Sequence, residues 1–144
     1  MMNIRFAVSK DIIVLSRYDK HISKSEMENA VRLNRIYIVE EEGHFAGWLR
    51  YNLFWDNTPF MNLLYILEEY QGRGFGRQLT AFWEKEMESQ GFGMVMTSTQ
   101  SDEYAQHFYF RLGYTAIGGF LWENDPYEVI FAKKLPAADK VGPD

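Results

Sequence analysis

The stretch Gln71-Gly72-Arg73-Gly74-Phe75-Gly76-Arg77 decides the fold prediction, because it separates two segments with different hydrophobic patterns. Before it, the apolar run 63–67 is too short for a buried helix and predicts a central strand covered on both faces. After it, apolar residues recur every three or four positions from Phe75 to Met87, which predicts an amphipathic helix that Gly91 ends. A strand therefore leads through a glycine-rich loop into a helix.

This loop has the properties of an anion-binding site. The N–H groups at a helix start and the helix dipole favour negative charge, and Arg73 and Arg77 add two positive charges. The spacing excludes a P-loop, which needs lysine and then serine or threonine after Gly76, and a dinucleotide fingerprint, which needs glycine or alanine at 77. The alternative is that the glycines only form a tight turn.

The rest of the chain alternates between predicted strands and helices. Ser23 to Glu26 has the Ser-x-x-Glu form of a capping box, which predicts the start of a short helix. Other helices are predicted from Ser9 or Asp11 onward and over residues 102–112. Strands are predicted over residues 3–8, 35–40, 45–54, 60–67, 94–99, 114–122 and 127–135. This order predicts an α/β or α+β layered fold with a mixed central sheet flanked by helices.

Length and composition narrow the function classes. A chain of 144 residues with 47% hydrophobic residues predicts one domain over residues 1–135, followed by a flexible tail over residues 136–144. The net charge of -5 argues against nucleic acid as a partner, and no apolar run is long enough to span a membrane. The absence of cysteine excludes disulfides and a cysteine nucleophile. We expect a cytoplasmic protein that needs no metal.

A second motif lies in residues 102–114, with the sequence Asp102-Glu103-Tyr104-Ala105-Gln106-His107-Phe108-Tyr109-Phe110-Arg111-Leu112-Gly113-Tyr114. Together with the glycine loop, in this order and spacing, it resembles the GNAT family of acetyl-CoA-dependent N-acetyltransferases. The resemblance covers about residues 3–135. It implies the acyl-CoA N-acyltransferase fold, with a mixed, mostly antiparallel sheet of six to seven strands.

The resemblance also implies where acetyl-CoA binds. Backbone amides of the loop would wrap the pyrophosphate, and the pantetheine arm would lie between strand 64–67 and strand 94–99, where a backbone N–H would stabilise the oxyanion. Asp102 stands where many relatives have an asparagine that contacts pantetheine, but an ionised carboxylate cannot donate a hydrogen bond. The expected cofactor-binding residues are Ile66, Leu67, Gln71, Gly72, Arg73, Gly74, Phe75, Gly76, Arg77 and Asp102.

Tyr109 matches the family's tyrosine that protonates the departing thiolate of coenzyme A, so the resemblance implies a general acid. From its position on an apolar helical stripe alone, a core tyrosine is the alternative. No residue stands out as the general base: Glu68 and Glu69 are weak candidates, and water could serve instead.

The acceptor is open at this stage. Tyr51, Phe54, Trp55 and Trp122 could line an acceptor cleft, or they could fill the core or a homodimer surface. Acidic and aromatic residues together favour a cationic amine of a small molecule or peptide. Because cysteine is absent, we expect direct transfer of acetyl to the amine in a ternary complex. The alternative function is a non-catalytic acyl-CoA-binding or sensor module.

Overall fold

The computed structural model describes residues 1–136 and contains seven strands and four α-helices within them. The chain divides into two compact units, a first unit of Met1–Asn52 with Leu63–Trp83 and a second unit of Leu53–Asn62 with Glu84–Asp144. The prediction of a single domain over residues 1–135 stays a prediction. The predicted tail covers residues 136–144, and all of it after residue 136 lies outside the described residues.

The strands form one mixed sheet, as the sequence predicts, and their order in it is β1-β2-β3-β4-β5-β7-β6. β1 with β2, β2 with β3, β5 with β7 and β6 with β7 are antiparallel, whereas β4 and β5 are parallel over two residue pairs, Phe60 with Met96 and Met61 with Thr97. The strands are β1 (Met2–Phe6), β2 (Ile36–Glu41), β3 (His44–Phe54), β4 (Thr58–Ile66), β5 (Met94–Gln100), β6 (Thr115–Phe120) and β7 (Glu128–Lys134).

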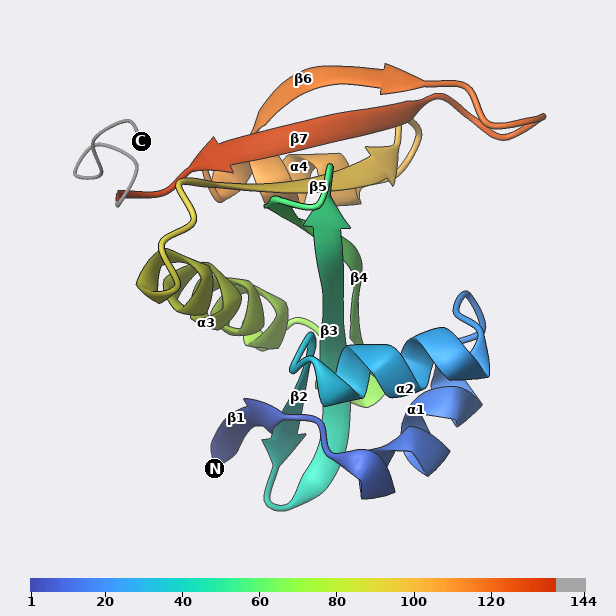
Figure 1. Cartoon of the computed structure of the whole chain (residues 1–144), viewed down its shortest axis with the longest axis vertical. Helices are drawn as coiled ribbons and strands as arrows, with labels where there is room; N and C mark the ends of the chain where they lie inside the picture. The colour runs from blue at the N-terminus through green and yellow to red at the C-terminus, as the bar shows by residue number, and fades with distance from the viewer. Residues whose placement is uncertain (137–144) are drawn as a thin grey trace. The chain divides into compact units, whose positions relative to one another are not determined.

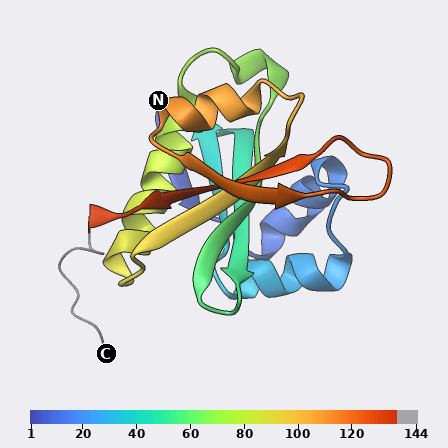
Figure 2. The same ribbon diagram turned by 90° about the horizontal axis from the view of Figure 1, so that it is seen from above.

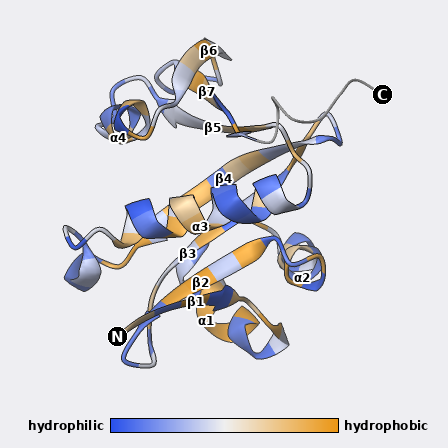
Figure 3. Ribbon diagram, turned by 90° about the vertical axis from the view of Figure 1, so that its left-hand side faces the viewer, coloured by the Kyte–Doolittle hydropathy of each residue, from blue (hydrophilic) through white to orange (hydrophobic). Residues whose placement is uncertain are grey.

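In the first unit, β2 and β3 are the most deeply buried strands. Ile36, Tyr37, Ile38 and Val39 of β2 are fully buried, and the helices α1 (Ile12–Tyr18) and α2 (Lys24–Arg32) lie beside these strands (Figure 1). Figure 3 shows hydrophobic residues along β1 and β2 and mixed colouring on the two helices. Apolar side chains of α1, α2, β2 and β3 share one cluster, which is Ala7, Leu15, Met27, Ala30, Val31, Ile36, Ile38 and Trp48.

The prediction that residues 63–67 are covered on both faces is wrong. Tyr65 is 46% exposed, and Leu63, Leu64 and Ile66 are only half-buried. The run is apolar because the strand has partly covered side chains on both faces, not because it is the fully buried centre of the sheet. β4 is the fourth of the seven strands, as predicted for a central strand, but the fully buried side chains gather on β2 and β3.

Both sides of β2 and β3 in this unit carry packed helices. The third helix, α3 (Phe75–Ser89), contributes Phe82, whose ring lies 5.7 Å from that of Tyr37, and Trp83, whose ring lies 5.8 Å from that of Tyr51. The predicted periodicity of this helix is confirmed, since Leu79, Trp83 and Met87 are fully buried. The predicted cap of α2 is also confirmed, because the Ser23 hydroxyl accepts a hydrogen bond from the Glu26 N–H.

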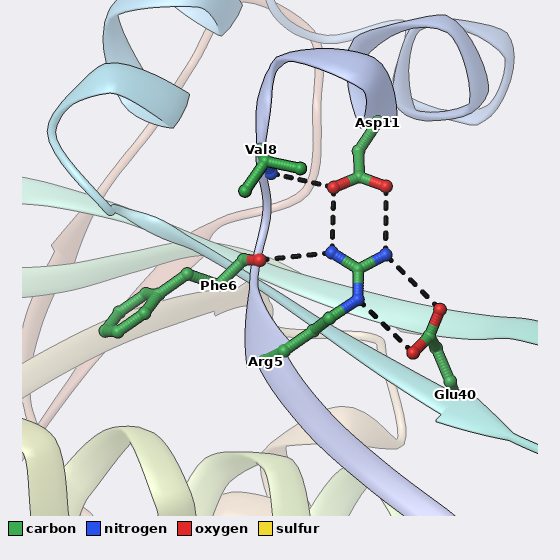
Figure 4. Close-up of polar contacts among 5 residues, drawn as sticks. All are labelled: Arg5, Phe6, Val8, Asp11 and Glu40. Carbon is green, nitrogen blue, oxygen red and sulfur yellow. Dashed lines mark hydrogen bonds and ion pairs between the residues drawn. The ribbon is translucent and has the colours of Figure 1, made fainter. Parts of the chain in front are cut away.

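Arg5 ties β1 to the turn that follows it and to β2 (Figure 4). Its guanidinium donates two hydrogen bonds to the Asp11 carboxylate, at 2.8 and 2.9 Å, and two to the Glu40 carboxylate, at 3.2 Å each. Asp11 also accepts a bond from the Val8 N–H, which closes the short 3₁₀ helix η1 (Ser9–Asp11). The Arg5 bonds are the largest influence on the pKa of Asp11 and hold it below its ordinary value.

In the second unit, β5, β7 and β6 form a continuous ladder with α4 (Ala105–Arg111) packed against β5 (Figure 2). The α4 helix begins at Ala105 and its N-cap is Tyr104, so the predicted helix start at residue 102 is wrong. The Glu84 carboxylate accepts hydrogen bonds from the Tyr114 hydroxyl at 2.7 Å and from the Lys133 ammonium at 2.9 Å. These bonds tie the C-terminal half of α3 to β7 and to the residue before β6.

The Arg5 bonds give a pH-dependent stability. Replacing Asp11 by Asn removes the ion pair, and we expect a loss of about 2 kcal/mol in the free energy of unfolding at pH 7. Because the folded pKa of Asp11 lies below the unfolded value, this stabilisation is present above about pH 4 and is lost as the pH falls through the folded pKa. Urea unfolding from pH 7 to pH 2 measures it, with the exposed Glu28→Gln as the control. A gap between wild type and Asp11→Asn that does not narrow below pH 4 contradicts this account.

Candidate active site

The glycine loop joins the end of β4 to the start of α3 through the short 3₁₀ helix η2 (Glu68–Tyr70), which the sequence did not predict. Gly72 and Gly74 have φ angles of +77° and +82°, a left-handed backbone that other residues adopt at a cost. This reverses the chain so that α3 begins at Phe75. The N–H groups of the first turn of α3 have no partner within the helix, and this turn carries no acidic residue.

Three neighbouring side chains hold Arg73 in place on the loop. Its guanidinium carbon lies 5.0 Å from the ring centre of Phe75 and 5.8 Å from that of Tyr70. These two rings are themselves stacked at 6.1 Å. The guanidinium also approaches the Glu41 carboxylate at 3.6 Å, yet half of the Arg73 side chain remains exposed. Arg73 is thus oriented by the fold and still accessible to an anion.

The end of β4 is fixed by bonds from both sides. The Gln71 side-chain amide donates to the Ile66 carbonyl at 2.8 Å, and the Leu67 N–H donates to the Ala46 carbonyl on β3 at 2.8 Å. Gln71 therefore anchors the loop to the strand. Because the Leu67 N–H is already bonded to β3, it is not free to bind a ligand. Of the two backbone N–H groups expected to contact the cofactor here, this leaves the Ile66 N–H.

Gly47 on β3 allows β4 to come close at the same place. A Cβ atom built there would lie 2.5 Å from the Tyr65 carbonyl oxygen and 2.7 Å from a methyl carbon of Ile66. Real Cβ atoms do not approach other atoms at such distances. Only glycine fits here without moving the backbone of one strand.

Tyr109, in the second unit, is buried on α4, with 6% of its surface exposed. Its ring lies 5.5 Å from that of Tyr114 and 6.1 Å from that of Phe131. Burial raises the pKa of Tyr109 to about 12, an increase that a hydrogen bond with Thr97 partly offsets. The Thr97 hydroxyl donates its own hydrogen to the Met61 carbonyl at 2.9 Å. A hydrogen bond lowers the pKa of a tyrosine only when it is donated to the tyrosine oxygen, so the single hydrogen of the Thr97 hydroxyl can serve either the Met61 carbonyl or the Tyr109 oxygen.

Glu68, Glu69 and Asp102 are not buried among other side chains as Tyr109 is. Glu68 and Glu69 are exposed on η2, directly after the end of β4, where the sequence placed them. Asp102 is exposed in the turn before α4. None of the three is enclosed by other side chains.

The aromatic residues considered for the acceptor cleft fall into different environments. Tyr51 is buried and stacks at 6.2 Å on Tyr37, so it belongs to the core. Trp55 and Trp122 are 81% and 62% exposed, in a turn and after β6 respectively. Of the two alternatives for these residues, Tyr51 therefore fills the core and does not line an acceptor cleft.

Sequence reasoning missed Thr97 and Asp19. Asp19 is buried at the C-cap of α1 and forms an ion pair with Arg50 of β3, with 2.9 Å between oxygen and nitrogen. A single charged residue, Arg50, within the mainly apolar strand 45–54 was a signal that a buried carboxylate lies nearby. Its identity depends on the tertiary fold, since Asp19 precedes Arg50 by 31 residues.

A sequence model described as Acetyltransferase (GNAT) family matches residues 11–114. The chain belongs to the GNAT acetyltransferase family. The matched region contains both the glycine loop and Tyr109. The predicted resemblance and fold are therefore confirmed. A search of curated protein sequences gave no match.

Solved structures share this GNAT fold across nearly the whole chain. The yncA protein of Salmonella typhimurium, solved with its cofactor acetyl-CoA, is 17% identical, with 100% of this chain and 98% of that chain covered and a TM-score of 0.80. A GNAT acetyltransferase of Bacillus cereus is 24% identical, with coverage of 94% and 98% and a TM-score of 0.74. The ribosomal-protein-S18-alanine N-acetyltransferase of Escherichia coli is 16% identical, with coverage of 94% of each chain and a TM-score of 0.75.

Membrane-spanning helices and metal-binding groups of side chains would indicate other functions. Within residues 1–136, no helix is long and apolar enough to cross a membrane. Across the same part of the chain, no three histidine or acidic side chains are grouped so that they could hold a metal ion.

The close approach at Gly47 gives a stability prediction. Gly47→Ala places a methyl group against the backbone of β4, and we expect a loss of about 3 kcal/mol in the free energy of unfolding. Gly43→Ala is the matched control, because a Cβ there meets nothing within 4 Å and only the φ of +80° is strained, at a cost of about 1 kcal/mol. Urea unfolding of both variants measures the difference. Equal losses would contradict the proposed steric role of Gly47.

Proposed function

We propose that this GNAT protein is an N-acetyltransferase that moves the acetyl group of acetyl-CoA directly to a primary amine in a ternary complex. The observation that carries the proposal is the glycine loop, where two left-handed glycines precede the unpaired N–H groups of α3. A helix start of this kind binds phosphate groups. Family membership and the acetyl-CoA bound in the Salmonella typhimurium structure support acetyl-CoA as the acyl donor.

The pyrophosphate of coenzyme A would accept hydrogen bonds from the backbone amides of residues 72–77. Arg73 and Arg77 are both exposed and add charge-assisted hydrogen bonds to the same group. Gln71 acts by fixing the loop to the Ile66 carbonyl. Asp102 is exposed and acidic, and we propose that it can accept a hydrogen bond from the pantetheine arm but not donate one.

Ile66 is our candidate for the oxyanion donor. Successive N–H groups of a strand point to opposite edges, and the Leu67 N–H points to β3. The Ile66 N–H then points away from β3. When the amine attacks the thioester carbon and the oxygen becomes negative, this N–H can donate a hydrogen bond to it. Collapse of the intermediate breaks the carbon–sulfur bond and releases the thiolate.

Tyr109 is our candidate for the acid that protonates this thiolate. Its raised pKa keeps it protonated at neutral pH, so it enters each cycle with a proton to give. The resulting tyrosinate is a buried anion that needs a donor. The Thr97 hydroxyl can turn from the Met61 carbonyl to that oxygen, which makes Thr97 a positioning residue for Tyr109.

The amine must lose a proton before or during attack. Glu68 and Glu69 are exposed, and we propose that water takes this proton, with either glutamate able to relay it to solvent. The transfer then needs no group with a strongly shifted pKa on the acceptor side. It also leaves no covalent acyl-enzyme, in keeping with the absence of cysteine.

Tyr109→Phe tests the function and the acid together. We expect wild type to acetylate members of an amine panel with multiple turnovers, and the variant to keep its affinity for acetyl-CoA while kcat falls about 100-fold. Because the pKa of Tyr109 is about 12, the wild-type kcat should show no decline between pH 8 and 10.5. Thiol release measures kcat, and calorimetry measures the affinity.

Two results of this experiment would count against the proposal. Acetyl-CoA binding without turnover on any amine would favour the sensor module over the enzyme. Unchanged kcat in Tyr109→Phe would remove Tyr109 from the acid role while leaving the transferase intact. Phe110→Leu, at a 48% exposed position on the same helix, is the control for general damage to α4.

Thr97→Val separates positioning from packing. Valine fills the same buried volume but has no hydroxyl, so the variant should fold, bind acetyl-CoA normally and lose about tenfold in kcat. Thr97→Ser restores the hydroxyl and should recover most of the rate. If the serine variant is as slow as the valine variant, Thr97 acts through its methyl group and not through Tyr109.

A further inference from the structure

We infer that a cavity in the first unit binds the apolar, ring-bearing part of the acceptor, so that this enzyme prefers aromatic primary amines to diamines and polyamines. The inference rests on the proposed transferase function and names the substrate class of its acceptor site. The cavity has a volume of about 230 Å³ and is lined by Tyr18, Asp19, His21, Trp48, Leu63 and Tyr65.

The walls of the cavity are mainly aromatic. The ring of Trp48 lies 6.2 Å from that of Tyr18 and 5.7 Å from that of Tyr65. Phe45 stacks on Tyr18 at 5.6 Å from behind and supports that wall. Tyr18 and Tyr65 are 43% and 46% exposed, whereas Trp48 is 2% exposed, so the cavity is open at the tyrosines and closed at the tryptophan. Surfaces of this kind favour flat apolar groups.

Asp19 does not make this cavity a site for an ammonium group. Its Oδ2 accepts bonds from the Trp48 indole N–H at 3.2 Å and from Arg50 Nε at 2.9 Å. Its Oδ1 accepts bonds from Arg50 Nη2 at 3.3 Å and from the His21 backbone N–H at 3.2 Å. Four donors use the acceptor positions of the carboxylate, and Arg50 neutralises its charge. The role of Asp19 is to hold the indole and the turn after α1 in place as cavity walls.

A second ammonium group would therefore be unfavourable in the cavity. It would lose its hydration without gaining a carboxylate, because Asp19 is already paired with Arg50. Attraction to the aromatic rings offsets only part of that loss. The cationic amine expected from the acidic and aromatic residues is thereby narrowed to one that carries a single ammonium group.

The cavity begins next to the proposed reaction centre. Leu63 and Tyr65 lie two positions apart on β4, so their side chains share one face of the strand. Tyr65 directly precedes Ile66, our proposed oxyanion donor. A ring held against Leu63 and Tyr65 would leave an amine on a chain of one to three atoms close to the Ile66 backbone. A cavity of about 150 Å³ accepts benzene, so the larger volume here accommodates a ring with its short chain.

The test compares acetyl transfer from acetyl-CoA to 2-phenylethylamine, butylamine and 1,4-diaminobutane. We expect kcat/KM for 2-phenylethylamine to exceed that for 1,4-diaminobutane at least tenfold, with butylamine between them. Leu63→Trp fills the cavity and should remove this preference without changing the affinity for acetyl-CoA. Leu33→Trp makes the same substitution at an exposed position at the end of α2 and should keep the preference.

Two further measurements keep the test decisive. If Leu63→Trp does not fold, Tyr65→Ala removes an exposed wall ring without adding volume and should lower the preference at least fivefold. Titration of wild type with 2-phenylethylamine in the absence of acetyl-CoA should shift the nuclear magnetic resonance signal of the Trp48 indole N–H. The indole N–H of Trp55, which is 81% exposed, is the internal control.

The outcomes separate the two claims. A shifted Trp48 signal with no transfer to any amine supports the cavity as an apolar binding site and overturns the proposed function. Transfer to 1,4-diaminobutane at least as fast as to 2-phenylethylamine overturns the cavity inference and leaves the transferase standing. An unchanged preference in folded Leu63→Trp or Tyr65→Ala also overturns it.

Discussion

Two left-handed glycines before the first turn of α3 are the constraint on which the account of this protein depends. Gly72 and Gly74 turn the chain after β4, so that the first N–H groups of α3 follow directly on the loop. Gln71 ties this loop to the Ile66 carbonyl, and Gly47 lets β3 approach the same strand end closely. The glycine loop and the end of β4 are thereby held in one fixed arrangement within the first unit.

Much of this arrangement could be predicted from local sequence, because hydrophobic periodicity and turn residues act over short distances. The strands, the α3 helix, the Ser23 cap and the glycine loop are where the sequence placed them. The predictions that failed depend on the neighbours of a segment. The sequence predicts too much burial for residues 63–67, because tertiary packing decides which side chains cover each face of a strand. The helix α4 starts three residues later than predicted, and no side chain caps it.

The candidate site was only partly predictable, for the same reason. Tyr109 and the loop could be found from two motifs, whereas Thr97 carries no motif and gains its meaning from a hydrogen bond with Tyr109. Asp19 and Arg50 show the same limit, since their ion pair joins residues 31 positions apart. That pair also changes the chemistry expected of an acidic protein. Its carboxylate is fully bonded to the chain's own donors, so the cavity beside it presents aromatic surface instead of charge.

The most direct test of the central claim is a titration of ¹⁵N-labelled protein with coenzyme A, followed through the backbone amide signals. The account predicts that the largest shifts fall on residues 72–77 and that 3′-dephospho-coenzyme A, which retains the pyrophosphate, produces the same pattern. Pantetheine, which lacks the pyrophosphate, should leave these signals in place. Shifts that leave residues 72–77 unaffected at saturating coenzyme A would contradict the account.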